Sequence, residues 1–185
     1  MATSAYGRTK AEGEALVATR CSRHLIFRTS WVFAFRGGNF LHTMLRLAQE
    51  REQLSVVDDQ FGAPTGAELI ADVTAFALKS ASRGESAAGI YHLAAAGETS
   101  WHGYARFAIE TARASAQGSR ITARQVEPVP SSAYRTVARR PHNSRLDTTK
   151  LQGAFALRLP PWQAGVERVL TETGWASPAG RARTA

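Results

Sequence analysis

Strand-like and helix-like segments alternate along the first 115 residues of this 185-residue sequence. The strands are recognised by β-branched and aromatic residues, and the helices by apolar residues that recur with helical spacing. The expected strands occupy residues 24–34, 54–59 and 89–95, and the expected helices occupy residues 5–20, 39–52, 67–80 and 99–115. Alternation of this kind is typical of α/β folds whose strands run parallel.

Two features indicate that the chain holds only the later portion of such a fold. Three strands are recognisable, whereas a doubly wound sheet usually has about five or more. The G-x-G-x-x-G loop that receives a dinucleotide pyrophosphate does not occur in the sequence. Two more helices are expected at 146–155 and 160–173, residues 121–146 are expected to be mostly extended or loop, and residues 176–185 are expected to form a disordered tail.

The composition excludes several classes of protein. Cys21 is the sole cysteine, so no internal disulfide can form, and a reducing cytoplasm is the expected location. No apolar run approaches the ~20 residues of a membrane span, and the first residues lack the apolar core of a signal peptide. The histidines show no metal-ligand spacing, so neither a bound metal nor a membrane contact is expected.

The net charge of +8 is unevenly distributed. Residues 120–185 hold eleven basic and four acidic residues, so most of the excess lies in the last third of the chain. Solvated arginines on a surface are the ordinary explanation, and a phosphate-bearing ligand is the next. The basic residues form no run interleaved with aromatic residues, so no nucleic-acid partner is expected.

Tyr6 and Lys10 are four residues apart within the first expected helix, in the stretch SAYGRTKAEGE. Side chains at positions i and i+4 share one face of a helix. A nearby ammonium group favours the phenolate and lowers the pKa of a phenol from about 10. A phenol tuned in this way can exchange a proton with the oxygen of a carbonyl substrate. The spacing also fits an ordinary helix surface, on which Tyr6 packs and Lys10 is solvated.

An ordered set of segments resembles the dTDP-4-dehydrorhamnose reductase family, which belongs to the extended short-chain dehydrogenases/reductases. The resemblance runs from residue 4 to about residue 172, and the set at matching spacing is highly specific. The segments are YGRTKAEGE, FRTSWVFAFRGGNFLHTMLRLAQEREQLSVVDDQFGAPT, GIYHLAAAGETSWHGYARFAIE, RRPHNSRLDTTKL and PPWQAGVERVL.

The resemblance implies a reductase reaction centred on Tyr6 and Lys10. In the family, the tyrosine that matches Tyr6 donates a proton. The lysine that matches Lys10 holds the nicotinamide ribose and lowers the pKa of the tyrosine. Hydride from NADPH or NADH would reach C4 of dTDP-4-dehydro-6-deoxy-L-mannose, and protonation of the new oxygen by Tyr6 would give dTDP-L-rhamnose.

Cofactor and sugar contacts are implied for the segment RTSW. Thr29 and Ser30 match a strand end beside the nicotinamide, and Trp31 matches a tryptophan that lines the sugar site. A core aromatic at a strand end is the alternative interpretation of Trp31. Asn39 and Phe40 begin a helix whose free N–H groups would meet the diphosphate, although Asn39 is equally well explained as a plain helix N-cap.

Nucleotide contacts are implied for two later segments. Gln60 and Thr65 match a substrate-side loop and would hydrogen-bond the nucleotide. Arg139 or Arg140 would pair with phosphate, and a solvated arginine is an equal alternative for either. The implied fold class is α/β, with the carboxy-terminal portion of a Rossmann-type doubly wound parallel sheet and a small substrate-binding α/β subdomain.

The sequence lacks two elements of the family, and their absence determines the domain organisation that we expect. The glycine-rich loop and the catalytic Ser or Thr that lies before the tyrosine are both absent. Residues 1–175 are therefore expected to form a substrate-binding region that includes the end of the NAD(P)-binding fold. The expected partner is either a missing amino-terminal half or a homodimer partner. Expressed alone, the chain is expected to be poorly soluble or to associate, because a central strand would be left as an edge.

Two other functions remain open. The family includes non-catalytic relatives, such as the regulatory subunit of methionine adenosyltransferase, which keep the fold and serve a partner enzyme. Another extended reductase or epimerase that acts on a different nucleotide sugar is the third hypothesis, because a few pocket contacts decide the identity of the sugar.

Overall fold

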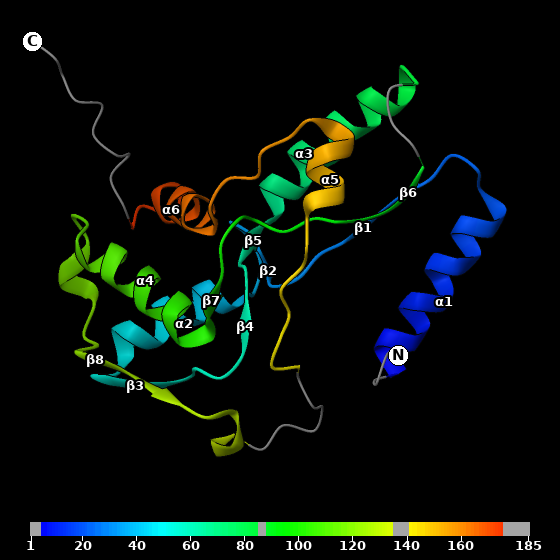
Figure 1. The fold of residues 1–185 in the computed structure, drawn as a ribbon. Helices are drawn as coiled ribbons and strands as arrows, with labels where there is room; N and C mark the ends of the chain where they lie inside the picture. Colours follow the sequence, from blue (N-terminus) through cyan, green and yellow to red (C-terminus); the bar gives the residue numbers. More distant parts are fainter. Residues whose placement is uncertain (1–4, 85–87, 135–140, 176–185) are drawn as a thin grey trace, which may run out of the picture.

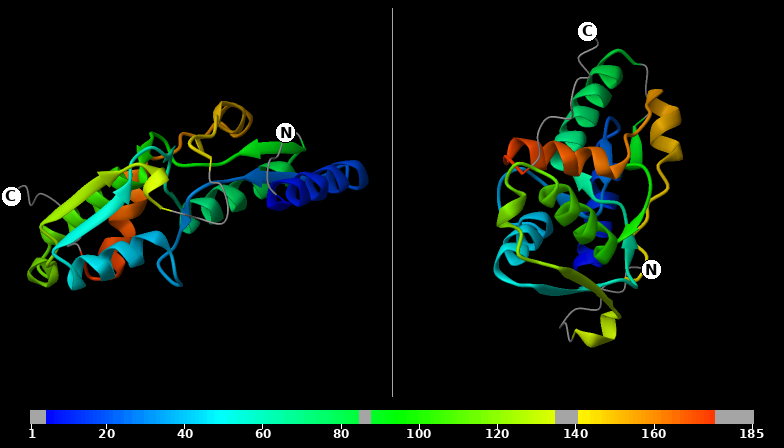
Figure 2. Two further views of the ribbon diagram at one scale, coloured as in Figure 1. Left: turned by 90° about the horizontal axis from the view of Figure 1, so that it is seen from below. Right: turned by 90° about the vertical axis from the view of Figure 1, so that its left-hand side faces the viewer.

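The computed structural model describes residues 5–84, 88–134 and 141–175. Figure 1 shows helices and strands that alternate through the first two-thirds of the chain. Figure 2 shows that the molecule is elongated, with α1 (Ala5–Arg20) at one end and the strands β3 (Gln53–Val57) and β8 (Gln125–Val129) toward the other. The end that holds α1 is called the arm below, and the opposite end is called the body.

The arm is built on a pair of parallel strands. β1 (Leu25–Arg28) pairs with β6 (Gly89–His92), with Ile26 opposite Ile90. The helices α3 (Ala67–Ser82) and α5 (Thr149–Phe155) pack on this pair through one cluster. The cluster is formed by Val73, Ala77, Tyr91, Leu93, Leu151, Phe155 and Leu159.

The body is built on a second parallel pair, in which β3 aligns with β8 and Leu54 lies opposite Val126. Two helices pack on it, α2 (Phe40–Glu50) and α4 (Trp101–Arg113), and α6 (Trp162–Glu172) packs against α4. Their buried faces form two clusters, one between α2, α4 and α6 and one between α2, α4 and β3. A mixed α/β fold with parallel strands is therefore confirmed.

The segments that connect the arm and the body along the sequence form two short strand pairs. β2 (Val32–Phe33) pairs in parallel with β5 (Thr65–Gly66), and β4 (Phe61–Gly62) pairs antiparallel with β7 (Thr99–Ser100). Among the described residues the strands form four separate pairs. The 3-10 turns η1 (Gly118–Arg120) and η2 (Ser131–Ala133) flank β8.

The prediction of a single strand over residues 24–34 is wrong, because the chain turns at Trp31. The backbone of Trp31 is left-handed, with φ at 51°, and its carbonyl accepts a hydrogen bond from the Thr65 N–H at 3.1 Å. Left-handed backbone is unusual for a bulky residue and interrupts a strand. The segment therefore forms β1 and β2, which pair with different partners.

Helix starts agree with the capping residues in the sequence. The Asn39 side-chain oxygen accepts from the His42 N–H at 3.1 Å and caps α2. The Ser100 hydroxyl accepts from the Gly103 N–H at 2.9 Å and caps α4. Each cap satisfies an N–H group that has no partner within its helix, so both helices begin where the sequence predicted.

None of the described helices combines the length and the apolar character that a bilayer crossing requires.

Candidate functional site

A pocket of about 1610 Å³ opens beside β3 and is called the β3 pocket below. One wall comes from α2 through Phe40, Met44 and Leu47, and another comes from β3 itself. Trp101, at the start of α4, completes the apolar side. The ring centroids of Phe40 and Trp101 are 4.6 Å apart, so these two side chains form one aromatic surface. A planar, partly apolar ligand group fits such a wall.

The polar side of the β3 pocket includes Gln60, Tyr134 and His142. Gln60 is only 8% exposed, and within the described residues no hydrogen bond satisfies its side-chain amide. An amide offers both donors and an acceptor. The Tyr134 hydroxyl donates to the Ser55 carbonyl at 2.7 Å, and the His142 ring lies 2.9 Å from the Asp59 carbonyl. Gln60 is thus a polar group available to a ligand in the pocket.

Asp59 binds Ser131, in the segment that follows β8, through hydrogen bonds at the edge of the β3 pocket. Its two carboxylate oxygens accept from the Ser131 N–H at 3.0 Å, and one of them also accepts from the Ser131 hydroxyl at 2.8 Å. Hydrogen bonds to the charged form favour ionisation. The Ser131 N–H therefore lowers the pKa of Asp59 below its ordinary value of 3.8.

Acid is expected to weaken this connection between Asp59 and Ser131. Because the pKa is lowered in the folded chain, the carboxylate stabilises the fold above about pH 5, and this contribution is lost as pH falls through the folded pKa. The difference in melting temperature between the parent chain and Asp59→Asn should narrow as pH falls from 7 to 3. Asp72→Asn, at an exposed position of α3, is the control. A difference that stays constant from pH 7 to pH 3 would contradict the assignment.

Trp31 packs against Trp101 of the aromatic wall and does not itself line the β3 pocket. Its indole stacks on the Trp101 indole with ring centroids 3.7 Å apart and an interplanar angle of 13°. A Cβ added at Gly62 would lie 2.6 Å from Cε2 of the same indole. The glycine is therefore required for Trp31 to occupy this position.

Gly62→Ala is expected to destabilise the fold by about 1–3 kcal/mol, because the new methyl group overpacks the indole of Trp31. Urea unfolding measures the loss. Gly153→Ala is the matched control: nothing lies within 4 Å of the added Cβ, and this position is inside α5, where alanine is favoured over glycine. Equal midpoints for Gly62→Ala and the parent would show that Trp31 does not pack against Gly62.

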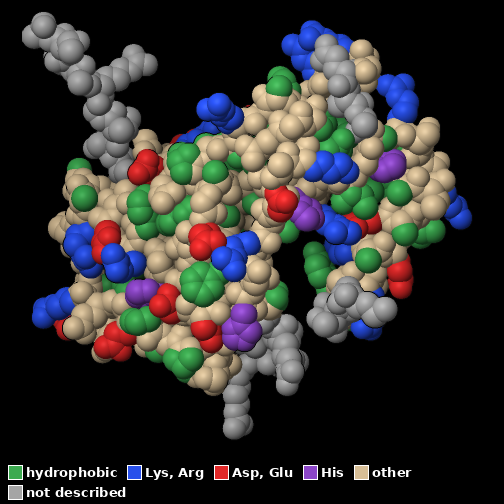
Figure 3. All heavy atoms as spheres, viewed as in Figure 1, with side chains coloured by type: hydrophobic (Ala, Val, Ile, Leu, Met, Phe, Trp, Pro, Cys, Tyr) green, Lys and Arg blue, Asp and Glu red, His purple; other side chains and the backbone are tan. Residues whose placement is uncertain are grey.

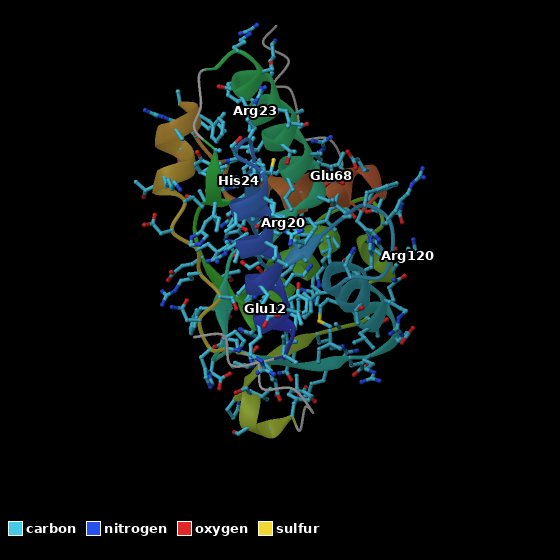
Figure 4. The ribbon with its side chains drawn as sticks, turned by 90° about the vertical axis from the view of Figure 1, so that its right-hand side faces the viewer. Glu12, Arg20, Arg23, His24, Glu68 and Arg120 are labelled. Atoms are coloured by element: carbon cyan, nitrogen blue, oxygen red, sulfur yellow. The ribbon has the colours of Figure 1, made fainter. Side chains whose placement is uncertain are left out.

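The predicted acid and cation lie on α1. The Lys10 ammonium is 5.6 Å from the Tyr6 ring centroid, so the two side chains share one face of the helix. Tyr6 is 73% exposed, and none of the sixteen residues of α1 is buried. Figure 4 shows α1 at the front of the molecule, with Glu12 and Arg20 along it. The pair is open to a ligand or to another surface.

An ion pair attaches α1 to the end of β1. Arg28 donates from Nε and Nη2 to the Glu14 carboxylate at 2.5–3.0 Å. The hydrogen bonds from Arg28 lower the pKa of the Glu14 carboxyl. Because Thr29 and Ser30 follow Arg28 directly, this contact fixes Glu14 of α1 beside the start of the RTSW segment. In the space-filling view, a notch separates the arm from the lower body, and side chains of both charges and histidine gather at its head (Figure 3).

The other predicted residues take different positions. Thr29 is exposed, and the Ser30 hydroxyl donates to the Ser144 carbonyl at 3.0 Å. Thr65 is fully buried, donates to the Ala63 carbonyl and accepts from the Ala95 N–H, so its hydroxyl is used within the fold. Asn39 is the cap of α2, and its amide donates to the Ala34 carbonyl at 2.8 Å.

The structure therefore brings Phe40 and Gln60 to the β3 pocket and places Trp31 behind Trp101. It does not bring Thr65 or the Asn39 side chain to the pocket lining. The predicted phosphate contacts Arg139 and Arg140 lie outside the described residues.

Trp101, Tyr134 and His142 line the β3 pocket but were not among the predicted site residues. Trp101 follows the Ser100 cap directly, and an aromatic residue at a helix start is one signal that could have singled it out. Tyr134 and His142 lie in a stretch without helical or strand periodicity, so the sequence gives no pattern that would place them. In the described residues, no group of three or more His, Cys, Asp or Glu side chains could hold a metal ion.

The model of the RmlD substrate binding domain matches residues 2–174. The chain belongs to this family.

Two curated relatives are named dTDP-4-dehydrorhamnose reductase. The protein from Shigella flexneri is 56% identical over 167 residues, and the protein from Escherichia coli K12 is 55% identical over 167 residues. Each match covers 90% of this chain and 55% of the relative. The chain thus spans about half the length of the curated relatives that it matches.

A solved structure supports the same relationship. The dTDP-4-dehydrorhamnose reductase of Bacillus anthracis, crystallised in complex with NADP, matches with a TM-score of 0.75 and 32% sequence identity. The match covers 90% of this chain and 55% of that chain.

Proposed function

We propose that this chain is the substrate-binding portion of a dTDP-4-dehydrorhamnose reductase, which reduces dTDP-4-dehydro-6-deoxy-L-mannose to dTDP-L-rhamnose with NADPH or NADH in the cytoplasm. The observation that carries the proposal is the Tyr6–Lys10 pair on one face of α1, in a chain 55–56% identical to two reductases. The pair supplies a proton donor with a cation beside it.

The chemistry follows from the two side chains. Tyr6 gives its phenolic proton to the oxygen at C4 of the sugar as that carbon is reduced. Lys10 stabilises the phenolate that remains and favours proton transfer. The Lys10 ammonium forms no ion pair with a carboxylate in the described residues, so its N–H groups are free to bind ribose hydroxyls. Bound nicotinamide supplies the hydride.

The β3 pocket is proposed to hold the nucleotide. Its aromatic wall, formed by Phe40 and Trp101, offers a stacking surface to the thymine ring. The Gln60 amide offers a donor and an acceptor, which matches the N–H and carbonyl groups of that base. Arg139 or Arg140 is proposed to pair with the diphosphate, and Trp31 to line the sugar site.

The residues of this chain fit the nicotinamide end of the cofactor and not the pyrophosphate end, because no glycine-rich loop is present. We propose that a mononucleotide-binding unit, corresponding to the unmatched part of the curated relatives, docks against α1 and β1. Leu16 is 55% exposed and Val17 is 45% exposed on α1, which supports a partner surface there.

Binding of a dTDP-sugar tests the proposal. The protein to use is a hybrid enzyme, in which the part of the Escherichia coli relative that this chain does not match precedes Ala2. Calorimetry should detect dTDP-L-rhamnose binding, and Gln60→Ala should weaken it by about five- to tenfold, because roughly one hydrogen bond is lost. Gln49→Ala, which lies outside the β3 pocket, is the control. A folded hybrid that binds NADPH but no dTDP-sugar would contradict the proposal.

A further inference from the structure

Trp101 connects the β3 pocket to Trp31. One face of the Trp101 indole stacks on Trp31, and its side chain also contributes to the pocket lining next to Phe40. A centroid separation of 3.7 Å at 13° means that the two indoles overlap almost fully. A ligand in the pocket and the indole of Trp31 therefore lie against the same side chain.

The Trp31 indole is enclosed between two neighbours. The three indole atoms closest to a Cβ added at Gly62 would be Cε2, Cδ2 and Nε1, at 2.6, 2.9 and 3.0 Å. Every in-plane direction at Cε2 is occupied by a ring bond, so the glycine approaches the indole from above its plane. Since Trp101 covers one face, Gly62 lies against the other. The indole has no room to tilt while Trp101 is present.

Trp101 is itself held firmly. It is the first residue of α4, directly after the Ser100 cap. The Ser100 hydroxyl accepts from the Gly103 N–H and donates to the Asp58 carboxylate, so the helix start is tied to the end of β3. Trp31, in contrast, lies between two short strands and has a left-handed backbone. Trp101 is thus the member of the stack whose backbone belongs to a helix.

From this arrangement we propose that Trp101 is a positioning residue, which fixes the orientation of the Trp31 indole at the sugar end of the site. The proposal rests on the proposed function for the statement that Trp31 faces the sugar. The orientation of Trp31 itself is independent of that function. Loss of the Trp101 ring should release Trp31 and misplace the sugar, while Phe40 and Gln60 still hold the nucleotide in the β3 pocket.

Fluorine NMR of the hybrid enzyme labelled with 5-fluorotryptophan tests the positioning. The Trp31 signal, assigned with Trp31→Phe, is expected to be narrow and displaced by the ring current of Trp101. Trp101→Leu should move it toward the position of free fluorotryptophan, and Trp101→Phe should keep much of the displacement. Trp162→Leu is the matched control, because Trp162 is buried in the neighbouring helical cluster and meets Tyr104 and Phe107 in T-shaped ring contacts.

Kinetics of the hybrid enzyme test the consequence for the sugar. Trp101→Leu should lower kcat by about ten- to a hundredfold, because misplacement of the reacting carbon by roughly 1 Å has effects of this size. The affinity for dTDP, which has no sugar, should fall by a smaller factor than kcat, because Phe40 and Gln60 still line the β3 pocket, and Trp101→Phe should restore most of kcat.

A Trp31 signal at the free position in the parent hybrid enzyme would overturn the proposal, even if Trp101→Leu does not fold. Equal shifts of that signal in Trp101→Leu and Trp162→Leu would also overturn it, as would equal losses of dTDP affinity and kcat. A parent hybrid without reductase activity would instead contradict the proposed function, and the NMR result would still decide the role of Trp101.

Discussion

Tyr6→Phe in the hybrid enzyme is expected to lower kcat by roughly 10²–10⁴-fold, the usual contribution of a positioned acid. Phenylalanine keeps the ring and removes the proton that would reach the sugar oxygen. Because Tyr6 is 73% exposed, the substitution should leave the fold intact. Initial rates of NADPH oxidation at saturating substrate measure the effect, and calorimetry should show nearly unchanged binding of dTDP-L-rhamnose.

Tyr104→Phe is the matched control for the loss of a tyrosine hydroxyl. Burial raises the pKa of Tyr104, and its hydroxyl has no hydrogen-bond partner among the described residues. Removing an unsatisfied buried hydroxyl is expected to be neutral or stabilising. Tyr104→Phe should therefore keep kcat within about twofold and should not lower the melting temperature. An unchanged rate in Tyr6→Phe would mean that Tyr6 is not the acid.

The 185-residue chain alone is expected to show no reductase turnover and no tight NADPH binding. It carries Tyr6 and Lys10 but has no glycine-rich loop for the pyrophosphate. Its α1 buries no residue, and its matched relatives are almost twice as long as the match. Fluorescence titration with NADPH and a coupled absorbance assay measure the two properties.

The hybrid enzyme is the positive control for this experiment, since it also contains the part of the Escherichia coli relative that this chain does not match. Light scattering should also report association of the isolated chain, because Leu16 and Val17 of α1 are exposed. Measurable reductase activity in the purified 185-residue chain would show that the cofactor needs no additional unit.

The helices of this fold were largely predictable because their determinants are local. Asn39 and Ser100 cap α2 and α4 in the structure, as their positions ahead of apolar helical patterns indicated. The helix expected at 5–20 is also present as α1. Capping and helical spacing depend on residues within a few positions of one another, so a single sequence contains this information.

The strands were harder to predict because their pairing depends on distant residues. β8 falls in a stretch that was expected to be mostly extended or loop; it contains Pro128 and pairs with β3, more than sixty residues earlier in the chain. The break at Trp31 depends on Gly62 and Thr65, which are also distant in sequence. Neither feature has a local signal.

The candidate site likewise has one part that depends on local sequence and one part that depends on residues far apart in the chain. The shared face of Tyr6 and Lys10 follows from a spacing of four residues on a helix, and the structure agrees with it. The β3 pocket combines α2, β3, Trp101 and the segment after β8, so no single pattern could assemble it. Thr65 illustrates the limit of a motif match, since its hydroxyl is satisfied inside the fold.

The reaction of the hybrid enzyme with NADPH and dTDP-4-dehydro-6-deoxy-L-mannose tests the central claim most directly. We predict that NADPH is oxidised only when the sugar nucleotide is present, and that NMR of the product identifies dTDP-L-rhamnose. The rate should fall in Tyr6→Phe and persist in Tyr104→Phe. A folded hybrid that binds NADPH and leaves this sugar nucleotide unreduced would contradict the account.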